Sequence, residues 1–507
     1  MYKLLYRSCK QTFRLMRRPV FSPSFLVLAS FLAAGCAVGS DFAAPSVPDV
    51  KNYDSTPTPD KTSDEAQILQ PGQDIPGDWW ALFHSDSLNR LIAQALKDNP
   101  DLASAEASLR VAQDNLAVSD AALFPTATAS FSSERQKTSG AQNNNLFPGY
   151  TYTLHNASVG VSYGLDVFGG TRRAIENFQA QADQAGFEKE AAYLTLTGNV
   201  VTASIQEASL REQIAATHAV IADQEKILKI LETRLAVGAV AKSAVAQQQS
   251  LLGTAKTSLP PLEHQLVVTR HLLSALIGQL PEKDGQEKFT LADLTLPAHV
   301  PLSLPSKLVE QRPDIRAAQE NLHAASAAIG VAEAARLPQI TLSADIGSVA
   351  TQFSKLFAPG SGFWSFGGSA AETIFDAGAL SDKEQAARDS YDVASAQYRK
   401  TVLGAFQNVA DTLHALQADA DGLTAQKEAE EATAESLSLI TAQFNAGSVN
   451  MADFLTAEQN EQQAKMALAQ ARAQRLADTA ALLVALGGGW WNRDAQTASS
   501  ESMKGIP

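Results

Sequence analysis

Very few side chains in this sequence are arranged for catalysis or metal binding. The eight histidines among its 507 residues are scattered, and no HExxH, paired-cysteine, glycine-rich phosphate-loop or nucleophile-elbow motif is present. The carboxylates have no evident catalytic partner, so we expect neither an enzyme, a metal site nor a bound cofactor. The chemistry that remains to be explained belongs to two cysteines, Cys9 and Cys36.

Cys36 stands behind a leader with the composition of a secretory signal. Residues 1–18 carry six basic residues and no acidic one, and an apolar stretch around residues 25–34 follows. That stretch is too short to span a bilayer as a stable helix. We therefore expect residues 1–35 to be a signal peptide whose removal takes Cys9 with it.

The sequence LAAGC at residues 32–36 resembles the lipobox of bacterial lipoproteins, in which the cysteine is acylated and becomes the mature N-terminus. Ala33 stands where leucine is usual. One acyl chain holds a protein on a membrane only weakly, whereas two or more anchor it stably. A multiply acylated Cys36 would therefore be a permanent anchor, and Ala37 after it resembles default sorting to the outer membrane. The alternative is an ordinary signal peptide with a stray cysteine.

The charge of the mature chain limits its partners. Removing the leader leaves 34 basic and 54 acidic residues, about −20 in all, from the −14 of the whole sequence. This balance argues against nucleic acid or an anionic membrane surface as the main partner. With Cys36 acylated no disulfide is possible, so stability must come from packing.

The sequence after the leader contains an internal repeat. Residues 99–130 align without gaps over residues 312–343, with Pro100 over Pro313 and Pro125 over Pro338. In each copy a proline tolerated in the first helical turn opens a helix and a second proline ends it. Residues 234–249 align over 443–458 at a slightly smaller offset, which places Gly238 over Gly447. The chain is thus a tandem duplication.

After each of these helices the hydrophobic period changes to two. Apolar residues alternate with small polar ones over residues 157–166 and 340–347, which predicts strands with one apolar and one polar face. Small hydroxyl side chains on the polar face are typical of the inner wall of a membrane barrel. The alternative is a half-buried sheet on a water-soluble core. The segments between paired strands are rich in Gly, Asn, Ser and Pro, so each repeat offers one hairpin.

Each hairpin is followed by an unusually long helical stretch. Residues 171 to about 235, and 380 to about 444, contain no proline and few glycines. A helix of about 65 residues would be roughly 100 Å long, so it must lie along other helices. A glycine-bearing turn at Gly238 and at Gly447 then reverses each long helix into a second one.

Four predicted strands are too few for a closed membrane barrel. A bilayer tolerates no unpaired strand edge, and the smallest membrane barrels have about eight strands. Several chains must therefore share one barrel; two copies would give eight strands and three would give twelve.

The segment LPSKLVEQRPDIRAAQENL (304–322) resembles the hallmark of the TolC-like outer-membrane efflux proteins, and CAVGSDFAAPSVP (36–48) resembles the mature start of their lipoprotein branch. The likeness extends over the mature chain as far as LGGGWW (486–491). It implies a mixed α and β membrane protein with tandem internal duplication. Long coiled-coil helical hairpins would form a helical barrel, and four β-strands per protomer would contribute to a twelve-stranded β-barrel in a homotrimer.

The resemblance also implies partners and function. The family's channels conduct small molecules passively across the outer membrane, together with a periplasmic adaptor protein and an inner-membrane pump, often of the resistance-nodulation-division type. A type I protein-secretion duct of the same fold and a lipid-anchored periplasmic coiled-coil scaffold remain as alternatives. A scaffold would need no strands.

Two sets of residues match functional positions of the family, and a third set follows from the alternation of the strands. The helix reversals match the tips that adaptors contact, although a helix-ending turn alone would also explain them: Leu235, Val237 and Gly238, and Phe444, Gly447 and Val449. Asp453 and Thr456 match the periplasmic gate, where a second acid is usual in place of Thr456; a lone Asp near a helix start can equally be a solvated or capping residue. Asp166 and Asp345 follow the polar strand faces and would project into the lumen.

These features predict the domain organisation, which runs in chain order. We expect a signal peptide at 1–35, a lipidated N-terminal and equatorial segment at 36–98, a first repeat at 99–280 with its hairpin at about 126–168, a linker at 281–311, a second repeat at 312–489 with its hairpin at about 339–375, and a flexible tail at 490–507.

Overall fold

The computed structural model describes residues 38–48, 50, 52–55, 60–64, 66–139, 141, 149–282 and 287–493. The predicted signal peptide, Cys36 and residues 494–507 lie outside this part of the chain. The chain divides into two compact units, one made by residues up to 41, 119–175 and 327–387, the other by 42–118, 176–326 and those from 388 onward. Each unit takes segments from both sequence repeats.

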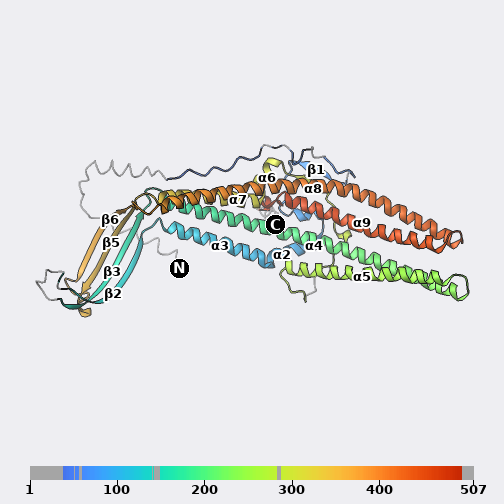
Figure 1. Ribbon diagram of the computed structural model, residues 1–507, viewed down its shortest axis with the longest axis horizontal. Coiled ribbons are helices and arrows are strands. Elements are labelled where there is room, and N and C mark those ends of the chain that lie inside the picture. The colour runs from blue at the N-terminus through green and yellow to red at the C-terminus, as the bar shows by residue number, and fades with distance from the viewer. Residues whose placement is uncertain are drawn as a thin grey trace, which may run out of the picture. The chain divides into compact units, whose positions relative to one another are not determined.

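The first unit contains a four-stranded antiparallel sheet in the order β2-β3-β5-β6 (Figure 1). Its strands are β2 (Thr126–Lys137), β3 (Thr151–Leu165), β5 (Gln339–Ala350) and β6 (Gly362–Ala371). The short 3-10 helix η4 (Phe353–Lys355) lies between β5 and β6. Both stretches that the two-residue period marked as strands are strands, which confirms that prediction. Within the described residues, the outer edges of β2 and β6 have no partner strand.

Four helices form two long hairpins (Figure 1). They are α4 (Gly170–Ala236) with α5 (Lys242–Leu276), and α8 (Ala379–Asn445) with α9 (Met451–Ala485). Each long helix has 67 residues and is thus about 100 Å long. The helices α3 (Pro100–Ala121) and α7 (Pro313–Ala334) each begin at a proline. The predicted bounds of the two long helices are confirmed to within about two residues, and the helices that begin at Pro100 and Pro313 end a few residues before the prolines expected to stop them.

The duplication is visible in the element bounds. The start of α3 at Pro100 corresponds to the start of α7 at Pro313, and the start of α4 at Gly170 to the start of α8 at Ala379. The offset is slightly smaller for the second pair than for the first. The second repeat is therefore slightly shorter, and the difference lies between the first strand of its hairpin and its long helix.

Shorter elements pack against the helices of the second unit. They are β1 (Ile68–Pro71), parallel to β4 (His299–Leu302), the α-helices α2 (Asp86–Asp98) and α6 (Pro305–Gln311), and the 3-10 helices η1 (Trp79–Phe83), η3 (Leu291–Asp293) and η5 (Trp490–Asn492). Trp79 and Phe83 of η1 are fully buried and join the core of this unit. Trp490 donates a hydrogen bond to the Gln311 carbonyl oxygen at 2.6 Å, so the packed structure continues past residue 489, where we expected a flexible tail to begin.

One feature distinguishes the two hairpins. Pro260 and Pro261 lie inside α5, whereas the corresponding positions of α9 are Ala469 and Gln470. A proline has no backbone N–H and removes one helical hydrogen bond.

Across the residues that the structure describes, no helix has both the length and the apolar character needed to cross a membrane.

Candidate functional site

The four-stranded sheet has one apolar and one polar face. The register aligns Ala129, Val159, Ile346 and Trp364 in one row across all four strands. The adjacent row, on the opposite face, contains Thr128, Gly160, Asp345 and Ser365. On the apolar face, Ile346 is 66% exposed and Trp364 79% exposed. Water is a poor solvent for such a face, which instead suits an apolar environment.

Asp345 lies on the polar face of β5, as the sequence predicts. Ser365 of β6 donates a hydrogen bond to its carboxylate at 3.4 Å. On the other side, a Cβ at Gly160 of β3 would approach the Asp345 Oδ1 to 2.6 Å, so a larger residue there would force the carboxylate to move. Its projection into a lumen stays a prediction.

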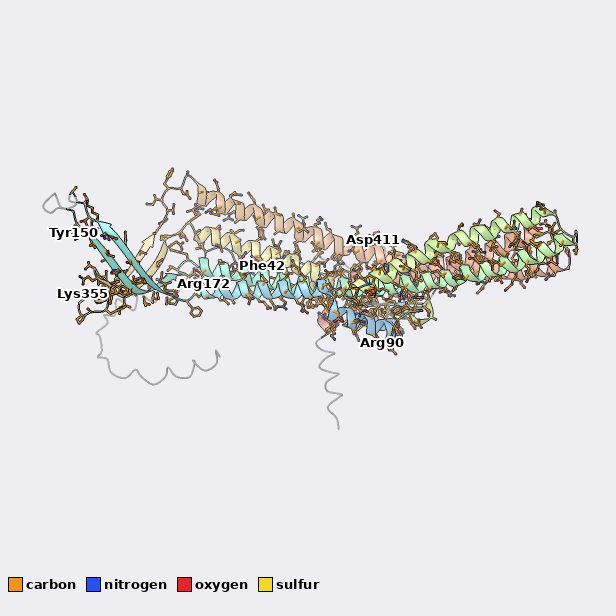
Figure 2. The ribbon with its side chains drawn as sticks, turned by 90° about the horizontal axis from the view of Figure 1, so that it is seen from below. Phe42, Arg90, Tyr150, Arg172, Lys355 and Asp411 are labelled. Atoms are coloured by element: carbon orange, nitrogen blue, oxygen red, sulfur yellow. The ribbon has the colours of Figure 1, made fainter. Side chains whose placement is uncertain are left out.

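Asp166 requires a correction, because it follows the last residue of β3 and does not lie on the strand. Its carboxylate accepts hydrogen bonds from the backbone N–H of Thr171 at 2.8 Å and of Arg172 at 3.0 Å. The side chain of Arg172, which is labelled in Figure 2, also donates to it at 3.1 Å. A carboxylate beside the free N–H groups of a helix start is stabilised there. Asp166 therefore holds the first turn of α4.

The two helix reversals have the same backbone geometry. In the first, the Gly238 N–H donates to the Leu235 carbonyl at 2.9 Å and the Ala239 N–H to the Arg234 carbonyl at 2.8 Å. The second repeats this pattern around Gly447, and both glycines have φ of +74°. This is a Schellman motif, which glycine forms without steric strain.

Side chains at the reversals connect the two hairpins. The Arg234 guanidinium lies 5.5 Å from the centre of the Phe444 ring, and Phe444 stacks on Phe454 at 5.2 Å. Val237, by contrast, is 77% exposed, while Leu235 and Val449 are half-buried. The packing of Arg234, Phe444 and Phe454 thus stabilises the helix ends beside the exposed glycine turns. Contact with an adaptor stays a prediction.

Asp453 and Thr456 lie in the first turns of α9, and both are exposed. The cap of this helix is Asn450, whose side chain accepts a hydrogen bond from the Asp453 N–H at 3.0 Å. Thr456 donates its hydroxyl hydrogen to the Ala452 carbonyl at 2.8 Å. The Asp453 carboxylate is therefore not the residue that caps the helix. Its role in a gate stays a prediction.

A buried carboxyl group that the sequence did not reveal lies one turn further along α9. Glu458 is only 8% exposed, and its Oε2 has no hydrogen-bond partner in the described part of the chain. Burial raises the pKa of Glu458 to about 7, and the negative charges of Asp223 and Glu461 add to the effect. Near neutral pH this group is thus partly protonated.

Further along α9, the buried Arg475 forms a cluster with polar and charged residues. Arg475 is 1% exposed and donates hydrogen bonds to Gln67 at 2.9 Å and to Thr62 and Asp64 at 3.0 Å. Burial, and next the neighbouring carboxyl of Asp478, raise the pKa of Asp419 to about 7. These contacts hold the chain around residues 62–67 against α9.

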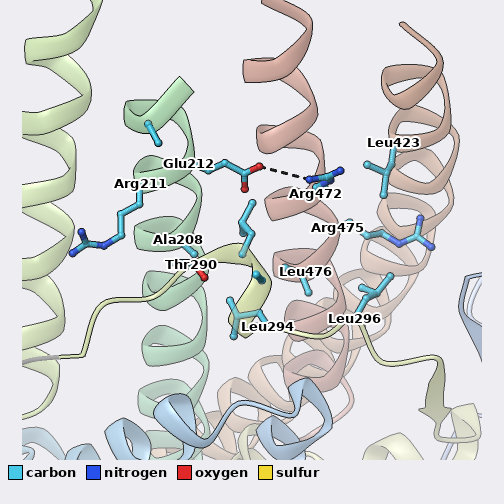
Figure 3. A pocket seen from close by; sticks show the side chains of 13 residues that line it. Ala208, Arg211, Glu212, Thr290, Leu294, Leu296, Leu423, Arg472, Arg475 and Leu476 are labelled. Atoms are coloured by element: carbon cyan, nitrogen blue, oxygen red, sulfur yellow. Dashed lines mark ion pairs between the residues drawn. The ribbon is translucent and has the colours of Figure 1, made fainter. Parts of the chain in front are cut away.

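Arg475 also lines a cavity of about 670 Å³ beside η3 (Figure 3). Its apolar wall is formed by leucines of η3, α8, α9 and the adjacent chain, and across it Arg472 faces Glu212 at 3.6 Å. The ion pair joins α9 to α4. Because its charged groups already have partners, we assign this cavity no ligand.

The chain that follows Cys36 is held at a defined place, although Cys36 itself lies outside the described residues. Val38 donates its N–H to the Phe168 carbonyl at 3.0 Å. The buried Arg173 donates to the Val38 and Gly39 carbonyls and to the Asp41 carboxylate, at 2.9–3.1 Å. Among the residues described, no group of acidic, histidine or cysteine side chains could hold a metal ion.

Sequence and structure comparisons all match this chain to outer-membrane efflux proteins, export proteins or channels. The family model described as outer membrane efflux protein matches residues 91–279 and 304–488. The pyoverdine export outer membrane protein OpmQ of Pseudomonas putida is 30% identical over 456 residues, or 86% of this chain and 94% of the relative. The antibiotic efflux pump outer membrane protein ArpC of Pseudomonas putida is 29% identical over 490 residues, covering 95% and 99%. The solved outer-membrane channel OprN superposes with a TM-score of 0.82 at 26% identity, covering 90% of this chain and 100% of that one.

Proposed function

Because the chain belongs to the outer membrane efflux protein family, we propose that it is the outer-membrane channel of a tripartite efflux pump. It conducts small molecules passively to the exterior from an inner-membrane pump and a periplasmic adaptor. Relatives are named for pyoverdine export and for antibiotic efflux, both of which move small molecules. The energy comes from the pump, and we assign the channel no catalytic role.

The two-faced sheet is the observation that carries this proposal. An exposed apolar face opposite a face of Thr, Gly, Asp and Ser suits a wall with lipid on one side and water on the other. The free edges of β2 and β6 cannot remain unpaired in a bilayer. Three copies would close a twelve-stranded barrel, and we propose this homotrimer on the strength of the family resemblance.

The helical hairpins supply the periplasmic part of the channel. Their exposed glycine turns, at Gly238 and Gly447, present matching backbone surfaces to an adaptor. The pump is of the resistance-nodulation-division type, as in the drug-efflux branch that the sequence resembles. We include in this proposal that Asp453, which is exposed in the first turn of α9, contributes to a ring of carboxylates at the periplasmic gate.

The lipid anchor on Cys36 belongs to the same proposal. Val38, two residues later, is hydrogen-bonded beside the end of β3, and Arg173 donates hydrogen bonds to Val38, Gly39 and Asp41. An extended chain spans at most about 3.6 Å per residue. Acyl chains on Cys36 would therefore enter the lipid close to the sheet.

Cysteine substitutions on opposite faces of β5 test the proposal. We expect purified Ser343→Cys protein in planar bilayers to lose conductance when a bulky charged thiol reagent is added, because Ser343 shares the polar face with Asp345. The matched Ala344→Cys variant, one residue along on the apolar face, should conduct as before. Absence of conductance in the unmodified protein, or equal block of both variants, would contradict the proposal.

A further inference from the structure

The strand contact that joins the two repeats, between β3 and β5, has no counterpart in the described part of the chain. The hairpin pair Thr126↔Ser162 of β2 and β3 reappears as Gln339↔Ala371 of β5 and β6. β5 therefore repeats β2 with the offset that separates Pro100 from Pro313, and β6 repeats β3 with the smaller offset that separates Gly238 from Gly447. These are the two offsets of the sequence duplication, so each strand residue has a defined counterpart.

The two hairpins are joined inside the chain by β3 and β5, which pair from His155↔Ala350 to Leu165↔Ile340. The counterparts of β3 and β5 are β6 and β2, the two strands whose outer edges have no partner in the described part of the chain. Moving each residue by its own offset converts His155↔Ala350 into Trp364↔Lys137, and Leu165↔Ile340 into Ile374↔Ala127. The contact between hairpins is thereby defined for a pair of chains.

We propose that β6 of one copy pairs with β2 of the next copy in this register, with Ile374 opposite Ala127 and Trp364 opposite Lys137 of the neighbouring copy. The inference rests on the proposed function only in requiring that copies assemble through their sheets. It adds the residues that meet, and it would hold for any number of copies.

The lengths of the strands support this register. β3 continues to Leu165 because its last three residues pair with Ile340–Leu342 of β5 after the contact with β2 has ended at Ser162. The counterparts of those three residues are 372–374, yet β6 ends at Ala371. Within the described part of one chain, no strand lies beside residues 372–374 to pair with them, and Ile374 is 97% exposed. The proposed register provides the partners, residues 127–129 of the next copy.

The chemistry of the two edges also agrees. Apolar-face residues of β6 lie opposite apolar-face residues of β2, for example Ala370 opposite Phe131. A shift by one residue would instead place apolar residues of one strand beside polar residues of the other. Phe366 comes to lie opposite Arg135, and Trp364 opposite Lys137, with 73% and 79% of these aromatic side chains now exposed. A cation beside an aromatic ring is a favourable cross-strand neighbour.

Disulfide crosslinking between copies distinguishes this register from its nearest rival. Directly opposed residues have Cβ atoms about 5 Å apart, within disulfide reach, whereas diagonal neighbours at about 7–8 Å are too far apart. We expect the Ala127→Cys/Ile374→Cys variant to shift from one copy to two and more on a non-reducing gel after oxidation. In the matched Ala129→Cys/Ile374→Cys variant both cysteines lie on the same face of the sheet but are offset by two residues, so we expect no crosslinked bands. The natural cysteines, Cys9 and Cys36, precede the sheet.

The same measurements separate the two levels of the argument. Crosslinking of the offset pair alone, in protein of normal assembled mass, would overturn the register and leave the proposed channel intact. A protein that remains a single copy by mass would overturn both. If the first variant does not assemble, Lys137→Cys/Trp364→Cys tests the same register at the other end of the contact, where the absence of a crosslink in assembled protein would refute it.

Discussion

The buried carboxyl of Glu458 makes the α4–α9 contact sensitive to pH. Its pKa is about 7 in the fold, against an ordinary value of 4.5, because it is buried and faces the carboxylate of Asp223. Between pH 4.5 and pH 7 the carboxyl of Glu458 keeps its proton in the folded chain and loses it in the unfolded segment. The stability of the α4–α9 contact is therefore greatest below about pH 4.5 and decreases as the pH rises to about 7.

The size of the effect follows from the shift of the pKa. One unit corresponds to about 1.4 kcal/mol, so the full cost of ionising Glu458 in the fold is up to about 3 kcal/mol. Between about pH 5 and pH 8 we expect the local opening free energy of this region to fall by about 2–3 kcal/mol. In Glu458→Gln, which cannot ionise, that fall should disappear, and the variant should be the more stable protein at about pH 8.

Hydrogen–deuterium exchange measures this directly, with peptides that cover residues 452–465 of α9 and 217–231 of α4. After correction for intrinsic exchange rates, protection in the wild-type chain should drop by between about tenfold and a hundredfold from about pH 5 to pH 8. Glu232→Gln, which removes an exposed carboxylate of α4, is the matched control and should behave as wild type. The reasoning is refuted if Glu458→Gln keeps the pH dependence or if Glu232→Gln removes it.

Four further substitutions test the contacts described above. Gly238→Ala and Gly447→Ala should each destabilise their turn by about 1–2 kcal/mol because of the positive φ, since the described residues leave the space around the added Cβ open to 4 Å apart from the chain neighbours. Hydrogen exchange of the adjacent helix ends measures this, and protection equal to wild type would contradict it. Arg475→Met should lower stability by about 1–3 kcal/mol, because the buried Gln67 and Thr62 each lose a hydrogen bond with Arg475, and a thermal unfolding midpoint equal to wild type would be the opposing result. Arg173→Ala should expose residues 38–41 to limited proteolysis while the rest of the chain stays protected, and unchanged cleavage there would show that other contacts hold the segment.

The elements could be predicted from the sequence because each has a local cause. Pro100 and Pro313 open helices, and alternation marks the strands from residue 157 and from residue 340. The glycine turns follow from a need for positive φ, which the structure shows at both positions. Duplication then supplies each signal twice, so a weak pattern in one copy is supported by the other.

The burial of charged groups could not be predicted in the same way. Glu458 lies among the polar residues of a helix whose alanines allow close packing, and nothing in its neighbours along the chain shows that it faces Asp223. Arg475 meets Gln67 and Thr62, which lie near the opposite end of the sequence. The alternation extends to Asp166 and predicts a strand residue there, whereas the bonds of Asp166 to Thr171 and Arg172 belong to the start of the following helix.

The prolines of α5 make the two hairpins mechanically unequal. Pro260 and Pro261 leave the carbonyls of Lys256 and Thr257 without their helical donors, whereas α9 carries Ala469 and Gln470 at the corresponding positions. The helix α5 thus has a flexible point near its middle, whereas α9, its counterpart in the second hairpin, is continuous. If the channel widens at its periplasmic end, the first hairpin is the one that can bow, while the second can only pivot as a unit.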